Sequence, residues 1–149
     1  MAVFQRQKAG DLWETNGIVK MHIPYQEKLK HKVDFRVKYK FYSEAEGGRK
    51  SLPYQGIRFD FWYEHEDAKE NSVYIIWPEF EDEKQNVILD NTKSVPESGT
   101  ARMWIIMDKM RKYHRDRIKV GIIGFFFEGK KVGRCEVIEI IGLLENPIE

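Results

Sequence analysis

A single run of alternating residues constrains the fold of this chain more than any other feature. Every second residue from 33 to 41 is apolar: Val33, Phe35, Val37, Tyr39 and Phe41. The residues between them are all charged. Successive side chains of a β-strand point to opposite faces, so the pattern predicts a strand over residues 32–42 with one apolar and one charged face. We expect the five apolar side chains to enter one hydrophobic core.

Shorter apolar runs follow this strand at close spacing, with turn residues between them. They cover residues 57–63, 73–77, 87–89, 101–107, 118–127 and 132–141. Residues 79–83 have the composition of an acidic loop, and the last two runs form the arms of a hairpin joined through residues 128–131. About seven strands without alternating helices predict an all-β fold. The architecture that we expect is an antiparallel six- to seven-stranded β-barrel, with a sandwich as the alternative.

Helical character is weak throughout the chain. Residues 107–118 are polar and basic enough for a short helix, although a loop fits equally well. Residues 1–30 show no sustained period, which favours an N-terminal arm or an extra strand. Residues 31–149 then form one barrel domain, a length that buries a hydrophobic core without disulfide bonds.

The composition indicates an ordinary globular protein, with 42% hydrophobic and 33% charged residues. The one cysteine, Cys135, excludes an intramolecular disulfide and fits a reducing compartment. It alternates with Val137 in a predicted strand, so we expect a buried structural thiol. The N-terminal residues lack the apolar segment of an export signal, and no run is long enough to span a membrane. These features predict a cytoplasmic protein.

The formal net charge of +1 hides an uneven distribution. Residues 1–40 carry nine basic and four acidic side chains, residues 41–99 carry six and thirteen, and residues 100–149 carry ten and seven. The net charges are therefore +5, −7 and +3. Such asymmetry predicts surfaces of opposite sign rather than a uniformly basic protein.

The segment from Glu46 to Tyr63 carries a recognisable motif, E-G-G-R-K-S-L-P-Y-Q-G-I-R-F-D-F-W-Y. It resembles the opening motif of the third, C-terminal β-barrel domain of elongation factor Tu, whose form is roughly E-G-G-R-H-T-P-F-F-x-G-Y-R-P-Q-F-Y. The matching positions are Glu46, Gly47, Gly48, Arg49, Gly56, Arg58 and Phe61. Residues 128–133 are similar to the family's final hairpin, R-E-G-G-R-T-V-G, and are one residue shorter. The resemblance covers roughly residues 33–142 and implies the same barrel, standing alone without the GTPase.

The resemblance implies a function in translation, namely contact with the backbone of tRNA or of a similar structured RNA. The family's contacting arginine corresponds to Arg49, and its hairpin residues correspond to Glu128 and Gly129. The family's glutamine in R-P-Q-F is replaced by Asp60. Duplex RNA is recognised mainly through shape, phosphates and 2′-hydroxyls, for which basic side chains are suited. The candidate RNA-binding residues in this region are Arg49, Lys50, Arg58, Glu128, Gly129, Lys130 and Lys131.

A second basic cluster lies in residues 109–119, with six Lys or Arg residues in eleven positions. Tyr113 in its middle could stack on a base or sugar. Either this cluster contacts a polyanion, or it is a solvated loop or helix. The candidate RNA-binding residues that it adds are Arg111, Lys112, Arg115 and Arg117.

Catalytic and metal chemistry have little support in the sequence. No G-x-x-x-x-G-K-[ST] phosphate loop is present, so we expect no GTP or ATP binding. Residues 64–67 contain acidic and histidine side chains, but neighbours on a strand point to alternate sides and rarely converge on one ion. We therefore predict a non-enzymatic binding module without a metal or cofactor.

A protein-interaction module that acts without RNA is the alternative function. The acidic residues 79–90 lie in sequence near aromatic residues that we expect to be exposed. Aromatic residues surrounded by charge are common at protein interfaces. The family's third domain also meets protein partners, including its nucleotide exchange factor. The aromatic residues in question are Trp62, Trp77 and Trp104.

Overall fold

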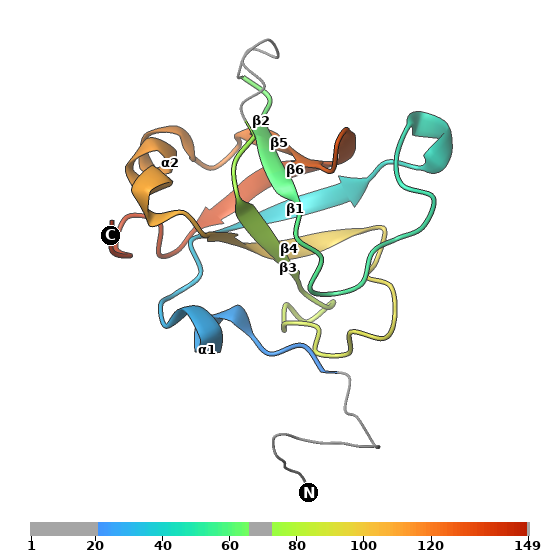
Figure 1. The fold of residues 1–149 in the computed structure, drawn as a ribbon, viewed down its shortest axis with the longest axis horizontal. Coiled ribbons are helices and arrows are strands. Elements are labelled where there is room, and N and C mark those ends of the chain that lie inside the picture. Colours follow the sequence, from blue (N-terminus) through green and yellow to red (C-terminus); the bar gives the residue numbers. More distant parts are fainter. Residues whose placement is uncertain (1–20, 66–72, 149) are drawn as a thin grey trace, which may run out of the picture.

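A computed structural model describes residues 21–65 and 73–148 of the chain. The described part is mostly β-structure, with a few short helices at its periphery (Figure 1). The strands are β1 (Phe35–Phe41), β2 (Asp60–Tyr63), β3 (Ile76–Phe80), β4 (Ser98–Ile105), β5 (Ile123–Phe127) and β6 (Lys131–Ile140). The helices are α1 (Tyr25–Leu29), η1 (Glu44–Glu46), η3 (Asp108–Met110) and α2 (Arg111–Arg117).

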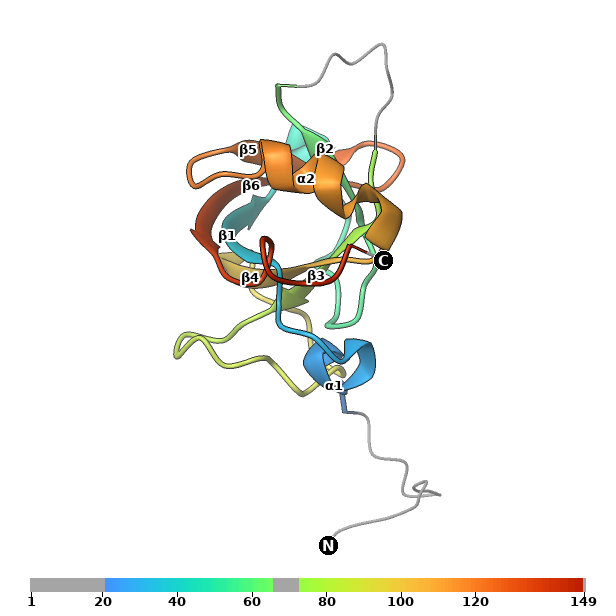
Figure 2. The same cartoon turned by 90° about the vertical axis from the view of Figure 1, so that its left-hand side faces the viewer.

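The six strands form one antiparallel sheet in the order β2-β5-β6-β1-β4-β3. The two outermost strands curl toward each other, as the view along the barrel in Figure 2 shows. Strand β2 is joined to the segment just before β3, where the Phe61 amide donates to the Tyr74 carbonyl at 2.8 Å and the Tyr74 amide donates to the Phe61 carbonyl at 2.9 Å. The sheet is thus a nearly closed antiparallel barrel, which confirms the all-β prediction.

Strand β1 lies in the middle of the sheet, between β6 and β4. The alternation seen in the sequence places its four apolar side chains in the main core, as predicted. Val33, just before the strand, is also buried but packs in a separate cluster with Tyr25 and Trp104. Burial of large aromatic side chains supplies most of the hydrophobic stabilisation in such a core. The aromatic residues at the centre are Phe35, Tyr39, Phe41, Phe59, Phe61, Tyr63, Phe80 and Phe126. Cys135 is buried in the same core, as predicted, and burial raises the pKa of its thiol.

The acidic segment predicted as a loop over residues 79–83 is a turn only from residue 82 onward, and its first part belongs to the sheet. Strand β3 extends through Phe80, and the carboxylates of Glu79 and Glu81 are buried. Glu81 accepts hydrogen bonds from Arg36, Thr100 and Arg102, which compensate for its removal from water. Local composition does not show such partners, because they come from distant strands. The predicted strand at residues 87–89 is reduced to a single bridge between Val87 and Glu81.

The segment before the barrel also differs from expectation. Within residues 21–30, Met21 forms an isolated bridge with Asp90, and the short helix α1 follows instead of an extended arm. The helix is fixed by Glu79, which accepts from the Tyr25 amide at 2.8 Å and from the Trp104 indole at 3.0 Å. The predicted arm or strand over residues 1–20 lies outside the described residues. None of the helices in the described part of the chain is long and apolar enough to cross a membrane.

Candidate nucleic-acid interface

The loop after β1 has a conformation that requires its two glycines. Helix η1 begins with a capping box, in which the Ser43 hydroxyl accepts from the Glu46 amide and the Glu46 carboxylate accepts from the Ser43 amide. Gly47 ends the helix at φ +96°, a left-handed conformation that favours glycine. Gly48 packs against the β1 end so closely that an added Cβ would lie 2.1 Å from the Tyr42 carbonyl oxygen. The chain therefore turns sharply and presents residue 49 beside the barrel.

Arg49 joins this loop to the β5–β6 hairpin. Its Nη1 donates to both carboxylate oxygens of Glu128 at 2.8 Å, and its Nε donates to the Ser51 carbonyl at 3.1 Å. The guanidinium also lies 5.9 Å from the ring centre of Phe59, which belongs to the aromatic core. The contacts with Glu128, Ser51 and Phe59 restrict the Arg49 side chain, and only a quarter of its surface is exposed. Arg49 is thus partly neutralised and firmly positioned.

A second bond connects the same two segments. The Lys130 ammonium donates to the Gly48 carbonyl at 3.2 Å, while Gly129 adopts the left-handed conformation, at φ +72°, that closes the hairpin. Lys50 is exposed beside them. We call the group formed by Arg49, Lys50, Glu128, Gly129, Lys130 and Lys131 the loop–hairpin patch. These candidates are separated by about eighty residues in sequence, and the fold brings them together.

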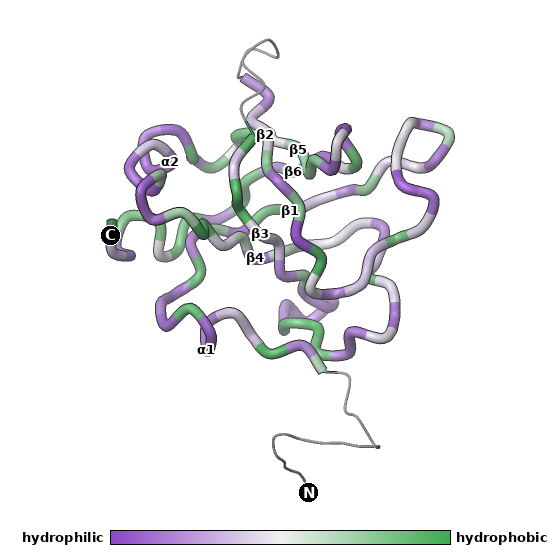
Figure 3. The backbone as a smooth tube through the Cα atoms, viewed as in Figure 1, coloured by the Kyte–Doolittle hydropathy of each residue, from purple (hydrophilic) through white to green (hydrophobic). Residues whose placement is uncertain are grey.

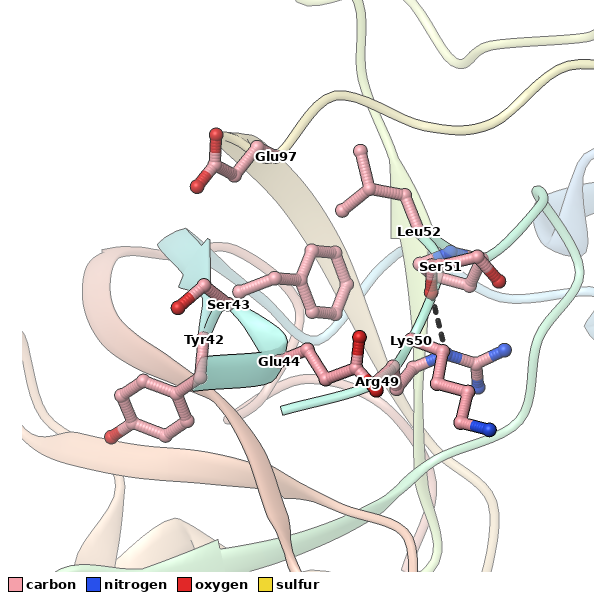
Figure 4. Close-up of a pocket in the computed structure, with 10 residues that line it drawn as sticks. Tyr42, Ser43, Glu44, Arg49, Lys50, Ser51, Leu52 and Glu97 are labelled. Carbon is pink, nitrogen blue, oxygen red and sulfur yellow. Dashed lines mark hydrogen bonds between the residues drawn. The ribbon is translucent and has the colours of Figure 1, made fainter. Parts of the chain in front are cut away.

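The loop–hairpin patch borders two surface hollows. One, of about 380 Å³, lies between the loop and the hairpin and is lined by Arg49, Lys50 and Lys130 together with Glu44 and Glu128. The other, of about 230 Å³, opens toward Glu97; Figure 4 shows Arg49 and Lys50 on one side of it and Glu97 on the other. The cations thus line both hollows together with carboxylates, Glu44 in both and Glu128 in the larger one.

Lys131 occupies the outer face of the barrel next to the hairpin. Its ammonium lies 4.1 Å from the ring centre of Phe125 and 4.8 Å from that of Trp62. Cation–π attraction holds such an ammonium against the aromatic rings while leaving it in contact with solvent. The Trp62 ring also packs edge-on against Phe127, at 5.2 Å. This part of the patch combines a positive charge with a half-exposed aromatic surface.

The second basic cluster is not part of this patch. Figure 1 shows α2 at one end of the barrel and the turquoise segment around residues 44–50 at the other. Lys112 is exposed, but Arg115 donates to the carbonyls of Leu143 and Asn146, and the Arg117 guanidinium lies 3.4 Å over the Tyr113 ring. Two of these cations therefore serve the structure of the α2 end.

Arg111 requires a correction, because it cannot contact RNA. Its side chain is fully buried and forms an ion pair with Asp34, and it also donates to the Ile105 carbonyl. Most residues of α2 are hydrophilic, as Figure 3 shows, and for this reason the sequence suggests a solvated surface. The buried carboxylate of Asp34 comes from the residue before β1, and only the tertiary structure places it opposite the helix.

Two further expectations about exposed residues change. Arg58 is exposed at the surface, but its guanidinium stacks over Trp77 at 4.3 Å, close to α1 rather than in the loop–hairpin patch. Trp104 is fully buried against Tyr25 and is removed from the predicted exposed aromatics. Trp62 and Trp77, which were also expected to be exposed, are half-buried. Part of the acidic run at residues 64–67 lies outside the described residues, and elsewhere in the described chain no three metal-ligating side chains converge.

The chain matches no protein-family model, and no curated protein is similar to it in sequence. The class of this protein is therefore described from its fold and from the loop–hairpin patch. It is an antiparallel β-barrel with six strands in its sheet, in which a Gly-Gly loop and a hairpin tip are bonded to each other and present cations at one end.

Proposed function

We propose that this protein is a non-catalytic module that binds the backbone of structured RNA, tRNA-like in shape, through the loop–hairpin patch. The observation that carries this proposal is the pair of bonds from Arg49 to Glu128 and from Lys130 to Gly48. They hold two cations, Arg49 and Lys130, in place at one end of the barrel, with Lys50 beside them. Preorganised cations lose less conformational entropy when they bind phosphates than free side chains do. The resemblance to the third domain of elongation factor Tu supports the same surface.

The RNA-contacting residues that we propose are fewer than the sequence indicates. Arg49, Lys50, Lys130 and Lys131 lie together, whereas the α2 cations lie at the other end and Arg111 is buried. Four phosphate contacts would give a slope of log K against log salt of about −3 to −4. Binding to total tRNA should therefore weaken by about a hundredfold between 50 and 200 mM salt.

Fluorescence anisotropy with labelled total tRNA at these two salt concentrations tests the proposal. The variant K50Q/K130Q should bind more weakly and with a shallower slope, because it loses two phosphate contacts. The variant K109Q/K119Q removes two exposed cations outside the patch and serves as the matched control. Equal loss in both variants, or binding no tighter than to polyglutamate, contradicts the proposal.

A protein partner bound without RNA is a second candidate, favoured by a separate observation. Met21, Ile23 and Leu89 are each 39–53% exposed, and they lie on two segments joined by the bond from the His22 amide to the Leu89 carbonyl. Exposed apolar side chains on adjacent segments are typical of protein-contact surfaces. Capture of a protein that persists after ribonuclease treatment, and is lost in M21S/L89S, would support this candidate.

A further inference from the structure

The outer face of β1 presents three cations in succession, Arg36, Lys38 and Lys40. Each stands beside residues of the neighbouring strands β4 and β6, whose register is set by the sheet. Cross-strand neighbours on one face have Cβ atoms about 5 Å apart, and like charges placed directly opposite each other destabilise the sheet. The environment of each cation therefore shows how its charge is balanced.

The first of these cations, Arg36, lies opposite a second arginine, and a carboxylate bridges the two. Arg36 is paired with Arg102 across the β1–β4 ladder. The buried Glu81 carboxylate lies between them, accepting from Arg36 Nη2 at 2.7 Å and from Arg102 Nε at 2.8 Å. Glu139 adds a bond to Arg36 at 2.8 Å. Glu81 thus bridges the two opposing cations, and Glu139 adds a second carboxylate beside Arg36.

The third cation, Lys40, also lies opposite an arginine, but no carboxylate bridges this pair. Lys40 is paired with Arg134 across the β1–β6 ladder, and both side chains are exposed. Among the residues that the structure describes, no carboxylate lies within 4.0 Å of either cationic group. Lys38, between the two pairs, has Glu136 at 3.6 Å. Among the described residues, Lys40 and Arg134 are thus a cross-strand pair of cations that no carboxylate bridges, and Glu46 attracts Lys40 only from beyond ion-pair distance.

The pair opens onto a hollow of about 390 Å³ on the outer surface. Its lining contains three cations and two carboxylates, a net charge of +1, together with the Tyr42 ring. Both carboxylates have other partners: Glu136 pairs with Lys38, and Glu46 accepts from the Ser43 amide in the η1 capping box while also attracting Lys40. The hollow is large enough to hold a tetrahedral oxyanion, and Lys40 and Arg134 both line it.

We propose that Lys40 and Arg134 bind a phosphate group, which takes the bridging position that Glu81 takes between Arg36 and Arg102. The guanidinium fork of arginine and the lysine ammonium are the usual ligands of phosphate oxygens. Arg134 follows Lys131 by three residues on β6, and the register shift between them in the β5–β6 pairing leaves both residues exposed. The site therefore extends the loop–hairpin patch along the outer face. As a contact to RNA phosphate, this inference rests on the proposed function; as a phosphate site, it stands independently.

A titration with inorganic phosphate tests the site without RNA. In ¹H–¹⁵N spectra of the whole chain, phosphate at constant ionic strength should shift the Arg134 Nε–Hε signal and the β1 and β6 amides saturably. The variant K40Q/R134Q should lose these shifts in the amides and remain folded, because it removes a repulsion rather than a contact. The control K119Q, an exposed lysine beyond α2, should behave as the unaltered chain. Shifts of the β1 and β6 amides that persist in K40Q/R134Q, or that never saturate in the unaltered chain, overturn the inference.

A tRNA titration of the same variants separates the two sources of phosphate. If RNA supplies the group, K40Q/R134Q should lower the slope of log K against log salt by about 0.7–0.9, the contribution of one phosphate. An unchanged slope, with tRNA binding still dependent on Lys50 and Lys130, refutes the RNA contact and leaves the proposed function intact. Saturable phosphate binding at Lys40 and Arg134 in a protein that ignores tRNA refutes the proposed function and supports a site for free phosphate or a phosphate monoester.

Discussion

The Arg49 guanidinium and the Glu128 carboxylate join two segments that are 79 residues apart in the chain, with Nη1 2.8 Å from both carboxylate oxygens. The pair is partly exposed, so its own contribution to stability is about 0–1 kcal/mol. Its effect on the surface is larger, because it sets where the Gly-Gly loop stands relative to the hairpin. It also partly neutralises the arginine that we propose to contact a phosphate.

Replacing Glu128→Gln should therefore strengthen RNA binding while stability changes little. The neutral amide no longer holds the Arg49 charge, and the phosphate group gains a free guanidinium. Arg49→Ala should weaken binding to all RNA sequences alike and reduce the salt slope by about 0.7–0.9, since a phosphate contact carries no base information. Anisotropy titrations with two unrelated RNA hairpins measure both effects. Tighter binding by R49A than by E128Q would contradict this assignment.

Gly48→Ala should be among the most destabilising single changes in the loop. The new Cβ would lie 2.1 Å from the Tyr42 carbonyl oxygen, and backbone must move to admit it. We expect a loss of at least about 2 kcal/mol, typical of overpacking that the backbone cannot absorb. Gly47→Ala is the comparison, because its Cβ meets open space and only the left-handed φ is penalised, by about 1 kcal/mol. Urea unfolding of both variants gives the order, and a G47A loss equal to that of G48A would contradict it.

Arg111→Gln should unfold the protein more readily than any other neutralisation in the α2 region. The change leaves the Asp34 carboxylate buried without its cation, and breaking a buried ion pair costs about 3–5 kcal/mol. Lys112→Gln, one residue later and exposed, should alter stability by less than about 0.5 kcal/mol. Denaturant midpoints of the two variants distinguish a structural arginine from a solvated one. Similar midpoints would indicate that Arg111 is accessible after all.

Stability should fall in acid through Glu81. Burial acts to raise the pKa of this carboxyl, but hydrogen bonds from Arg36, Thr100 and Arg102 outweigh it and hold the pKa below its ordinary value of 4.5. A group with a lowered folded-state pKa stabilises the fold above its unfolded pKa and loses that contribution as pH falls through the folded value. The difference in thermal midpoint between the unaltered chain and Glu81→Gln should thus be largest near pH 7 and shrink steadily below pH 4.5. A difference that is constant from pH 7 to pH 3 would contradict this role.

Part of the loop–hairpin patch can be predicted from sequence, because its two segments carry turn residues that act locally. Two adjacent glycines before Arg49, and Gly129 in the hairpin, specify sharp reversals whatever lies around them. The bond from Arg49 to Glu128 cannot be read from composition or spacing. The same limit explains the error at Arg111, whose basic neighbours suggest a surface helix. A charged side chain is rarely buried without an oppositely charged or hydrogen-bonding partner, and the partner of Arg111 is Asp34, in a distant segment.

The sequence by itself determined the strand β1, the all-β class and the buried thiol of Cys135, since alternation along a strand is a local property that fixes which face is apolar. Only the tertiary structure decided which charges are balanced. Glu81 reaches Arg36 and Arg102 because three strands meet in one register, whereas Lys40 and Arg134 face each other without such a carboxylate. The reason is physical: charge compensation depends on distances of a few ångströms between side chains that are far apart in the chain, and these distances exist only once the barrel has formed.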